Sequence, residues 1–254
     1  MHIGKPGPEP DSKYTLKSTI LQNVTEEKDI GVIIDSELNF EKHISVKVNK
    51  ANSMFALLRR TFQYLDTDTF VPLYKTLVRT HLEFASSVWH PYKIKYIDKI
   101  ENVQRRATKQ LPGLKNLTYS ERLQKLKLPS LNFRRVRGDM IELYKILNGK
   151  YDKEAAQFVK LWKDMTTRTG VRGNSLKIFP QRARTELRRN AFALRVVKTW
   201  NTLPEIIVTS PTTNTFKNRL DKYWKNQTMM YEDYKSPITG SGEDLDIETD
   251  EEEL

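Results

Sequence analysis

Residues that could perform catalysis or hold a metal are sparse in this chain of 254 residues. Cysteine is absent, and the histidines lack metal-ligand spacing: His2, His43, His81 and His90. No two aspartates are adjacent, and there is neither a glycine-rich phosphate loop nor a Gly-x-Ser-x-Gly nucleophile motif. The sequence therefore indicates no catalytic constellation, no metal site and no cofactor.

Positive charge is the more informative chemistry. Between residues 168 and 198 there are nine Lys or Arg against one acid, Glu186, and seven of the nine are arginine. The planar guanidinium group suits phosphate oxygens. We therefore expect binding of phosphate backbones here, foremost through Arg182, Arg184, Arg188 and Arg189. The alternative is that these arginines are solvated or pair with acids of the same chain.

The charge is also unevenly distributed. The net charge is +11, but residues 236–254 hold eight acids and no Lys or Arg, so the preceding chain carries +19. Such a basic body points toward polyanionic partners, most often nucleic acid, but the charge alone indicates a lysine-rich solvated surface equally well. We expect residues 226–254 to form a disordered acidic tail, which can contact the basic body intramolecularly.

Hydrophobic periodicity predicts a mainly α fold that follows short strands. Strands are expected within residues 1–35, at 14–17, 20–22 and 30–34. Helices are expected at 41–60, 66–89, 94–111, 132–147, 188–201 and 213–224. Another helix begins at the capping box of Thr118 and Glu121 and ends before Pro129. Residues 150–187 read as a long loop, with a strand at 176–179.

The helix expected from Asp66 to Trp89 is central, because its apolar stripe is wide and rich in aromatic residues. Asp66 or Asp68 would cap its first turn, and His90-Pro91 would end it. The stripe consists of Phe70, Leu73, Tyr74, Leu77, Val78, Phe84, Ala85, Val88 and Trp89.

Together with the helices at 41–60 and 94–111, the helix expected from Asp66 to Trp89 predicts a small bundle over residues 36–112. The outer faces of those two helices carry the candidate phosphate contacts Lys47, Lys50, Arg105 and Arg106. A second helical region with the basic loop is expected over residues 113–225. No apolar run approaches the roughly 20 residues of a membrane span. The amino terminus has no signal-peptide pattern, and the absence of cysteine fits an intracellular protein of the nucleus or cytoplasm.

Several ordered residue runs resemble the end of the reverse transcriptase of LINE-type (non-LTR) retrotransposons, most closely the jockey and chicken-repeat groups. The resemblance covers about residues 1–225. The runs are Glu27–Asp35, Leu38–Phe40, His43-Ile44, Leu73–Arg79, Val88–Pro91, Ile100–Thr108, Leu128–Leu131, Trp200–Pro204 and Phe216–Asp221.

The resemblance implies the last palm strands at 1–35, a thumb over 36–112 that cradles template and primer, and a carboxyl-terminal region. It places Asp29, Ile30 and Gly31 at the hairpin that grips the primer end. The aspartates that hold two metal ions in this RNA-directed DNA polymerase family precede the matching segment, and this sequence has no such motif. The acidic tail has no counterpart in the family.

Together these observations predict a fragment of a mobile-element polymerase that holds RNA and DNA through basic helices and is not an enzyme on its own. The first alternative is an α-helical interaction module for an acidic protein partner. The second is an inactive, decayed element-derived chain. Neither the composition nor the motifs indicate a membrane partner.

Overall fold

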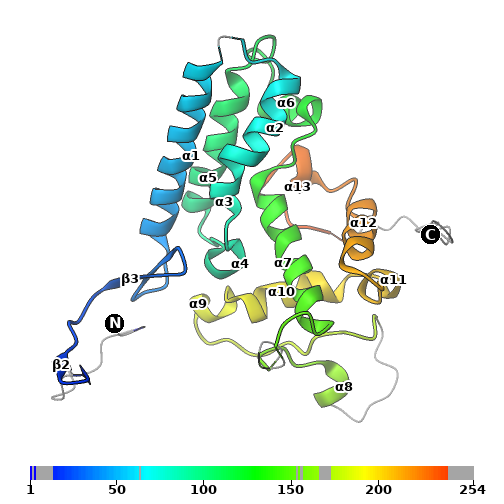
Figure 1. Cartoon of the computed structure of the whole chain (residues 1–254). Helices are drawn as coiled ribbons and strands as arrows, with labels where there is room; N and C mark the ends of the chain where they lie inside the picture. The colour runs from blue at the N-terminus through cyan, green and yellow to red at the C-terminus, as the bar shows by residue number, and fades with distance from the viewer. Residues whose placement is uncertain are drawn as a thin grey trace. The chain divides into compact units, whose positions relative to one another are not determined.

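A computed structural model of the chain describes residues 1, 3, 14–62, 64–152, 154, 157–165 and 173–239. The chain divides into two compact units, and the first ends at Leu131 while the second begins at Asn132. The fold is mainly α with short antiparallel strand pairs near the amino terminus, as predicted (Figure 1). The predicted tail lies partly outside the described residues, from residue 240 onward.

Two β-hairpins precede the helices of unit 1. Strands β1 (Thr15–Leu16) and β2 (Thr19–Ile20) pair with each other, and β3 (Glu26–Asp29) pairs with β4 (Val32–Asp35). In the second hairpin Asp29 lies opposite Val32, so Ile30 and Gly31 form a two-residue turn. The strand expected from residue 30 therefore begins at residue 32. Both turn residues have positive φ, 41° and 83°, which matches the twist of a tight hairpin.

Helix α1 (Glu41–Thr61) is the longest helix of unit 1, and apart from His43 its buried residues follow the helical period. It packs against the π-helical turn η1 (Tyr74–Val78), α3 (Arg79–Glu83) and α5 (Ile94–Lys109), which lie beside it in Figure 1. Helix α6 (Tyr119–Leu126) packs on α5 and belongs to unit 1, whereas we expected the division after residue 112. The buried residues of α1 are His43, Ile44, Val48, Ala51, Phe55 and Leu58.

The single helix expected over residues 66–89 is wrong. The segment forms α2 (Thr67–Leu73), η1, α3 and, after a break at Phe84-Ala85, the short α4 (Ser86–Trp89). Ala85 has φ 51°, so the chain changes direction there. Leu77, Phe84 and Val88, expected in the stripe, are exposed, and the buried residues are Phe70, Tyr74, Val78, Leu82 and Trp89.

The spacing of these residues explains the π turn. Four buried residues recur every four positions: Phe70, Tyr74, Val78 and Leu82. In a regular α-helix a step of four overshoots one turn by about 40°, so the row would drift out of the core. The wider turn at η1 offsets that drift and keeps the row buried. Asp66 caps α2 by accepting from the Thr69 amide at 2.7 Å, as predicted.

A polar cluster is buried where α5 meets the start of α6. Glu101 accepts from the Tyr119 hydroxyl at 2.5 Å and from the Leu131 amide at 3.0 Å. Gln104 accepts from the Tyr74 hydroxyl at 3.0 Å and donates to the Pro129 carbonyl at 3.1 Å. Burial and the neighbouring Glu101 carboxylate raise the pKa of Tyr119 far above its usual range. The run at 100–108 that carries the resemblance thus supplies side chains that hold the fold together.

Unit 2 is built on α7 (Leu131–Leu147), whose first residue closes unit 1, with α10 (Phe192–Asn201), α11 (Glu205–Val208) and α12 (Thr213–Tyr223). Its core stacks aromatic rings, with Phe216 4.4 Å from Tyr144 and 5.9 Å from Trp200 between centroids. The smaller helices α8 (Trp162–Met165) and α13 (Thr228–Tyr231) complete the described part of the unit.

Three expectations for unit 2 need correction. The helix expected over 188–201 is α9 (Glu186–Arg189) and α10, which separate at Asn190-Ala191. In place of a strand at 176–179, Ile178 forms an isolated antiparallel bridge with Leu161. Disorder from residue 226 is also wrong for residues 226–239, because α13 buries Met229 and Met230, and Gln227 pairs with the Thr239 backbone.

Candidate nucleic-acid interface

The tip of the β3–β4 hairpin has an unusual local conformation. Ile30 is β-branched, yet it has φ 41° and its side chain is 87% exposed. Such a residue pays a steric cost in the left-handed region, of roughly 1–2 kcal/mol, without burying its side chain. The two-residue turn itself requires positive φ, so the unusual feature here is an exposed β-branched residue at this position.

Gly31 brings this tip against an exposed aromatic ring. A Cβ on Gly31 would lie 3.2 Å from Cε1 of Phe84, and φ is +83°, so only glycine fits here without strain. The ammonium group of Lys47 lies 4.9 Å from the centroid of the same ring. Phe84 remains 47% exposed, so the ring offers an apolar surface between the hairpin tip and a cation.

Lys47 and Lys50 of α1 act on the same neighbourhood. Burial, and then the charges of Lys50 and Lys47, lower the pKa of His81 on α3. His81 therefore lies close enough to both lysines for their positive charges to lower its pKa. We call Ile30, Gly31, Lys47, Lys50, His81 and Phe84 the hairpin surface. Four of the predicted contacts, Ile30, Gly31, Lys47 and Lys50, lie on it, and Asp29 is the last residue of β3 beside it.

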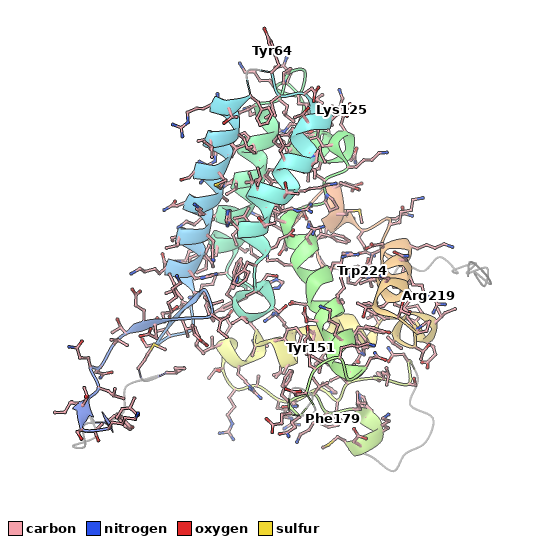
Figure 2. The ribbon with its side chains drawn as sticks, viewed as in Figure 1. Tyr64, Lys125, Tyr151, Phe179, Arg219 and Trp224 are labelled. Atoms are coloured by element: carbon pink, nitrogen blue, oxygen red, sulfur yellow. The ribbon has the colours of Figure 1, made fainter. Side chains whose placement is uncertain are left out.

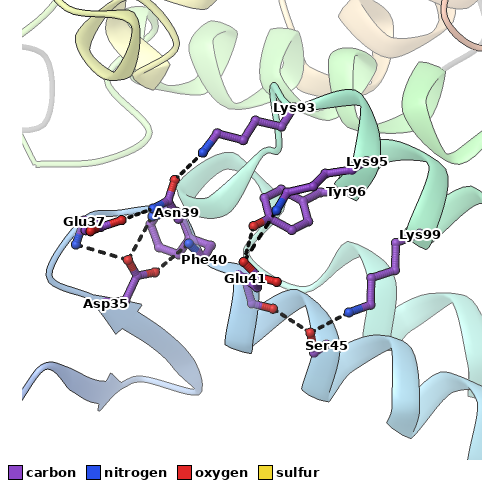
Figure 3. Close-up of polar contacts among 10 residues, drawn as sticks. All are labelled: Asp35, Glu37, Asn39, Phe40, Glu41, Ser45, Lys93, Lys95, Tyr96 and Lys99. Carbon is purple, nitrogen blue, oxygen red and sulfur yellow. Dashed lines mark hydrogen bonds and ion pairs between the residues drawn. The ribbon is translucent and has the colours of Figure 1, made fainter.

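The hairpin is fixed to the helices by the turn between β4 and α1, shown in Figure 3. The Asp35 carboxylate accepts from the amides of Glu37 at 3.1 Å, Asn39 at 3.0 Å and Phe40 at 2.6 Å. Lys93 then donates to the Asn39 side chain at 2.8 Å, which ties this turn to the segment before α5.

Along the same junction α5 is joined to the first turns of α1. The Tyr96 hydroxyl donates to the Glu41 carboxylate, Lys95 pairs with it at 3.7 Å, and Lys99 donates to the Ser45 hydroxyl at 2.6 Å (Figure 3). The Tyr96 hydroxyl, and then the charge of Lys95, lower the pKa of Glu41. The hairpin surface therefore rests on a rigid base.

His43 supplies a buried anchor for β4. Its Nδ1 accepts from the Ile33 amide at 3.1 Å, so the neutral ring carries its proton on Nε2. The ring is fully buried, and its centroid lies 5.2 Å from that of Trp89. Burial, followed by the charge of Lys47, lowers the pKa of His43 to about 4. His43 is thus neutral near pH 7 and serves the structure rather than acid–base chemistry.

Arg105 and Arg106 of α5 do not join the hairpin surface. Arg105 lies over the Tyr119 ring at 5.0 Å and donates to Asn102 at 3.1 Å. Arg106 contacts α1 at a different edge, where its guanidinium lies 3.4 Å from the side-chain oxygen of Asn52. Because each residue advances about 100° around a helix, Lys47 and Lys50 flank one edge of the buried face of α1, and Asn52 flanks the opposite edge.

The predicted arginines of unit 2 lie together on the segment that leads into α9. We call Arg182, Arg184, Arg188 and Arg189 the arginine quartet; all four are exposed. Thr185 caps α9 by accepting from the Arg188 amide at 3.2 Å, which fixes the last two on one short turn. Arg195, in contrast, pairs with the buried Asp139 through two contacts of 2.9 Å and is structural. Arg168 and Arg172 lie outside the described residues.

Sequence reasoning missed Phe84, His81, Arg59 and Lys109, whereas Arg106 was among the predicted contacts. Phe84 was assigned to the core because it matched the helical period, and only the break after Glu83 turns it outward. For the two cations the available signal was the basic last turns of both helices, with Arg59 in one and Arg106 and Lys109 in the other.

Comparison with known proteins gives no functional name. No family model matches the sequence, and no solved structure matches it. The chain is similar to an uncharacterized protein of Caenorhabditis elegans, with 26% identity over 126 residues, which make up 48% of this chain. The match spans 64% of the length of that relative.

Neither a membrane-spanning helix nor a metal site occurs in the part of the chain that the structure describes. Within those residues no helix is both long and apolar enough to cross a membrane. Nor do three His, Asp or Glu side chains gather there in a way that would hold a metal ion. The basic and aromatic surfaces are therefore the candidate functional features of the described residues.

Proposed function

We propose that the chain holds nucleic acid, as the thumb-containing carboxyl-terminal part of a LINE-type (non-LTR) reverse transcriptase without the aspartates of the polymerase site. The observation that carries the proposal is the hairpin surface. It combines a strained, exposed hairpin tip, an exposed ring and two lysines on one rigid base.

Each part of this surface suits a strand of nucleic acid. Because Gly31 lacks a side chain, the hairpin tip can lie against the Phe84 ring, so the tip and the ring can contact the same strand. Lys47 and Lys50 supply positive charge for phosphate oxygens, and such contacts dominate the affinity for nucleic acid. Ile30 and Phe84 offer apolar contact to sugars and base edges. None of these groups reads sequence, so binding has little sequence preference.

Binding of the full chain to a fluorescent RNA·DNA hybrid, measured over a range of salt concentrations, tests the proposal. The variant Lys47→Gln/Lys50→Gln is expected to bind more weakly at low salt and to reduce the salt slope by about two, roughly 0.9 for each lost phosphate contact. The matched control is Arg60→Gln/Lys125→Gln, which removes the same charge from exposed positions of unit 1 outside the hairpin surface. Equal slopes for the two variants would refute the role of the hairpin surface.

Two companion measurements separate the alternatives. As an isolated chain the protein is expected not to extend a primer with Mg²⁺, because two-metal catalysis requires closely spaced carboxylates. Extension by the purified protein would contradict this. Competition with polyglutamate tests the alternative of a module for acidic proteins. If the chain is such a module, polyglutamate should displace the hybrid at a concentration of negative charge similar to that of the hybrid itself.

A further inference from the structure

A groove lies at the end of unit 1 where α1 and α5 terminate. Its volume is about 580 Å³, within the range of ligand-binding pockets. Four cations line it: Arg59, Arg106, Lys109 and Lys115. The other lining residues are Gln110 and the apolar turn Leu111–Gly113, so none of the described residues that line the groove is acidic. We call it the α1–α5 groove.

The cations come from three separate segments and converge on one space. Arg59 lies in the last turn of α1, Arg106 and Lys109 lie in the last turn of α5, and Lys115 follows the helix. The Arg106 guanidinium donates to the Asn102 carbonyl at 3.2 Å and to the Asn52 side chain of α1 at 3.4 Å. Within the described chain Arg59, Lys109 and Lys115 have no acidic partner.

Helix electrostatics explain part of this arrangement but not all of it. Cations in the last turn of a helix interact favourably with its dipole, which accounts for Arg59, Arg106 and Lys109. Lys115 lies beyond the end of α5 and gains nothing from that dipole. Four like charges around one groove repel each other unless an anion neutralises them. The arrangement therefore favours a ligand with several negative charges.

An exposed aromatic residue lies at the same end of the unit. Tyr64 is 86% exposed, and Figure 2 shows it pointing outward past the end of α1. It follows Arg59 by five residues, so their Cα atoms are no more than about 18 Å apart. A positively charged groove with an exposed aromatic ring within reach suits single-stranded nucleic acid, because the backbone can follow the cations while a base stacks on the ring.

We propose that the α1–α5 groove binds the phosphate backbone of single-stranded nucleic acid, with a base stacked on Tyr64. A duplex keeps its bases stacked internally and has no free base for the ring, so the site prefers a single strand. The inference goes beyond the proposed function, because the groove is separate from the hairpin surface: Arg59 and Asn52 lie across the buried face of α1 from Lys47 and Lys50.

The test uses the full chain and a short fluorescent oligouridine RNA. The groove variant Arg59→Gln/Lys109→Gln/Lys115→Gln is expected to reduce the salt slope for this RNA by about two, since each single-strand phosphate contact contributes about 0.7. The matched control Arg60→Gln/Lys125→Gln/Lys127→Gln removes the same charge from exposed residues of unit 1 that do not line the groove. Its slope should fall much less.

Tyr64 supplies an independent variant that leaves the charge and the helices intact. Tyr64→Ala should bind oligouridine at least about five-fold more weakly, and Tyr64→Phe should bind it like the unaltered chain, because stacking needs only the ring. Neither substitution of Tyr64 should change the affinity for the RNA·DNA hybrid. Equal oligouridine binding by the groove variant and its control, or by Tyr64→Ala and Tyr64→Phe, would overturn the inference. The hybrid measurement with Lys47→Gln/Lys50→Gln tests the proposed function separately.

Discussion

Mild acid is expected to destabilise unit 1 through His43. The ring is buried, its Nδ1 accepts the Ile33 amide at 3.1 Å, and its pKa in the folded state is about 4. In the unfolded chain the same group has an ordinary pKa of about 6.5. Protonation would place a charge in the core and remove the acceptor that holds β4 on α1.

The sign follows from proton uptake. Between about pH 6.5 and pH 4 the unfolded chain binds a proton at His43 that the folded chain does not, so the free energy of unfolding falls as the pH falls. A pKa difference of about 2.5 units corresponds to about 3 kcal/mol in total. Of this, about 2 kcal/mol is lost between pH 7 and pH 5. The lowered pKa of His81 acts in the same direction as that of His43, whereas Glu41, Asp66 and Glu121 have lowered pKa values whose contributions are lost only at still lower pH.

Amide hydrogen exchange measures this effect within unit 1. The slowest amides of α1 report unfolding of the unit, and the Ile33 amide reports its bond to His43. After correction for the intrinsic exchange rate, protection at both sites should fall by about 2 kcal/mol from pH 7 to pH 5. In His43→Gln the amide oxygen can still accept from Ile33 but does not titrate, so most of the pH dependence should disappear. The same pH dependence in His43→Gln as in the unaltered chain would refute the reasoning.

Three further predictions follow from the charges. Arg195→Ala should destabilise unit 2 by about 3–5 kcal/mol in urea unfolding, because it removes a guanidinium that makes two contacts with the buried Asp139 carboxylate; a loss below 1 kcal/mol would contradict this. Replacing the whole arginine quartet by Ala should lower the salt slope for RNA binding by about three, with little change in stability, and an unchanged slope would exclude the quartet. Ending the chain at Thr239 removes the eight acids of the tail but keeps the Gln227 contact. The shortened chain should bind RNA more tightly than the full chain at low salt and equally at high salt. Equal affinity of the two chains at both salt concentrations would mean that the tail is only a solubilising segment.

Local signals in the sequence were the reliable ones. The buried face of α1 follows the helical period residue by residue, and the Asp66 cap and the Thr118–Glu121 capping box form as predicted, the latter with 2.6 Å from the Thr118 amide to Glu121. These patterns depend only on residues within one or two turns. A hairpin turn does form at Ile30-Gly31, but the role in gripping a primer that the resemblance implied for Asp29–Gly31 stays a prediction.

The predictions failed where contacts between residues that are distant in the sequence determine the structure. A period of 3.6 residues cannot register the π turn that keeps the row from Phe70 to Leu82 buried, so exposed Phe84 was assigned to the core. Glu101 and Gln104 look like surface residues, but Tyr119 and the backbone at residues 129–131 satisfy them in the interior. Likewise Arg195 looks like part of the basic run until Asp139, 56 residues earlier, is seen to pair with it.

The salt dependence of binding to an RNA·DNA hybrid tests the central claim most directly. If the full chain neutralises roughly six phosphates, the logarithm of its affinity should fall with the logarithm of the salt concentration at a slope of about −4 to −5. The hairpin-surface variant Lys47→Gln/Lys50→Gln should account for about two of that slope. An affinity independent of salt, or no binding at low salt, would contradict the proposal that this basic body holds nucleic acid.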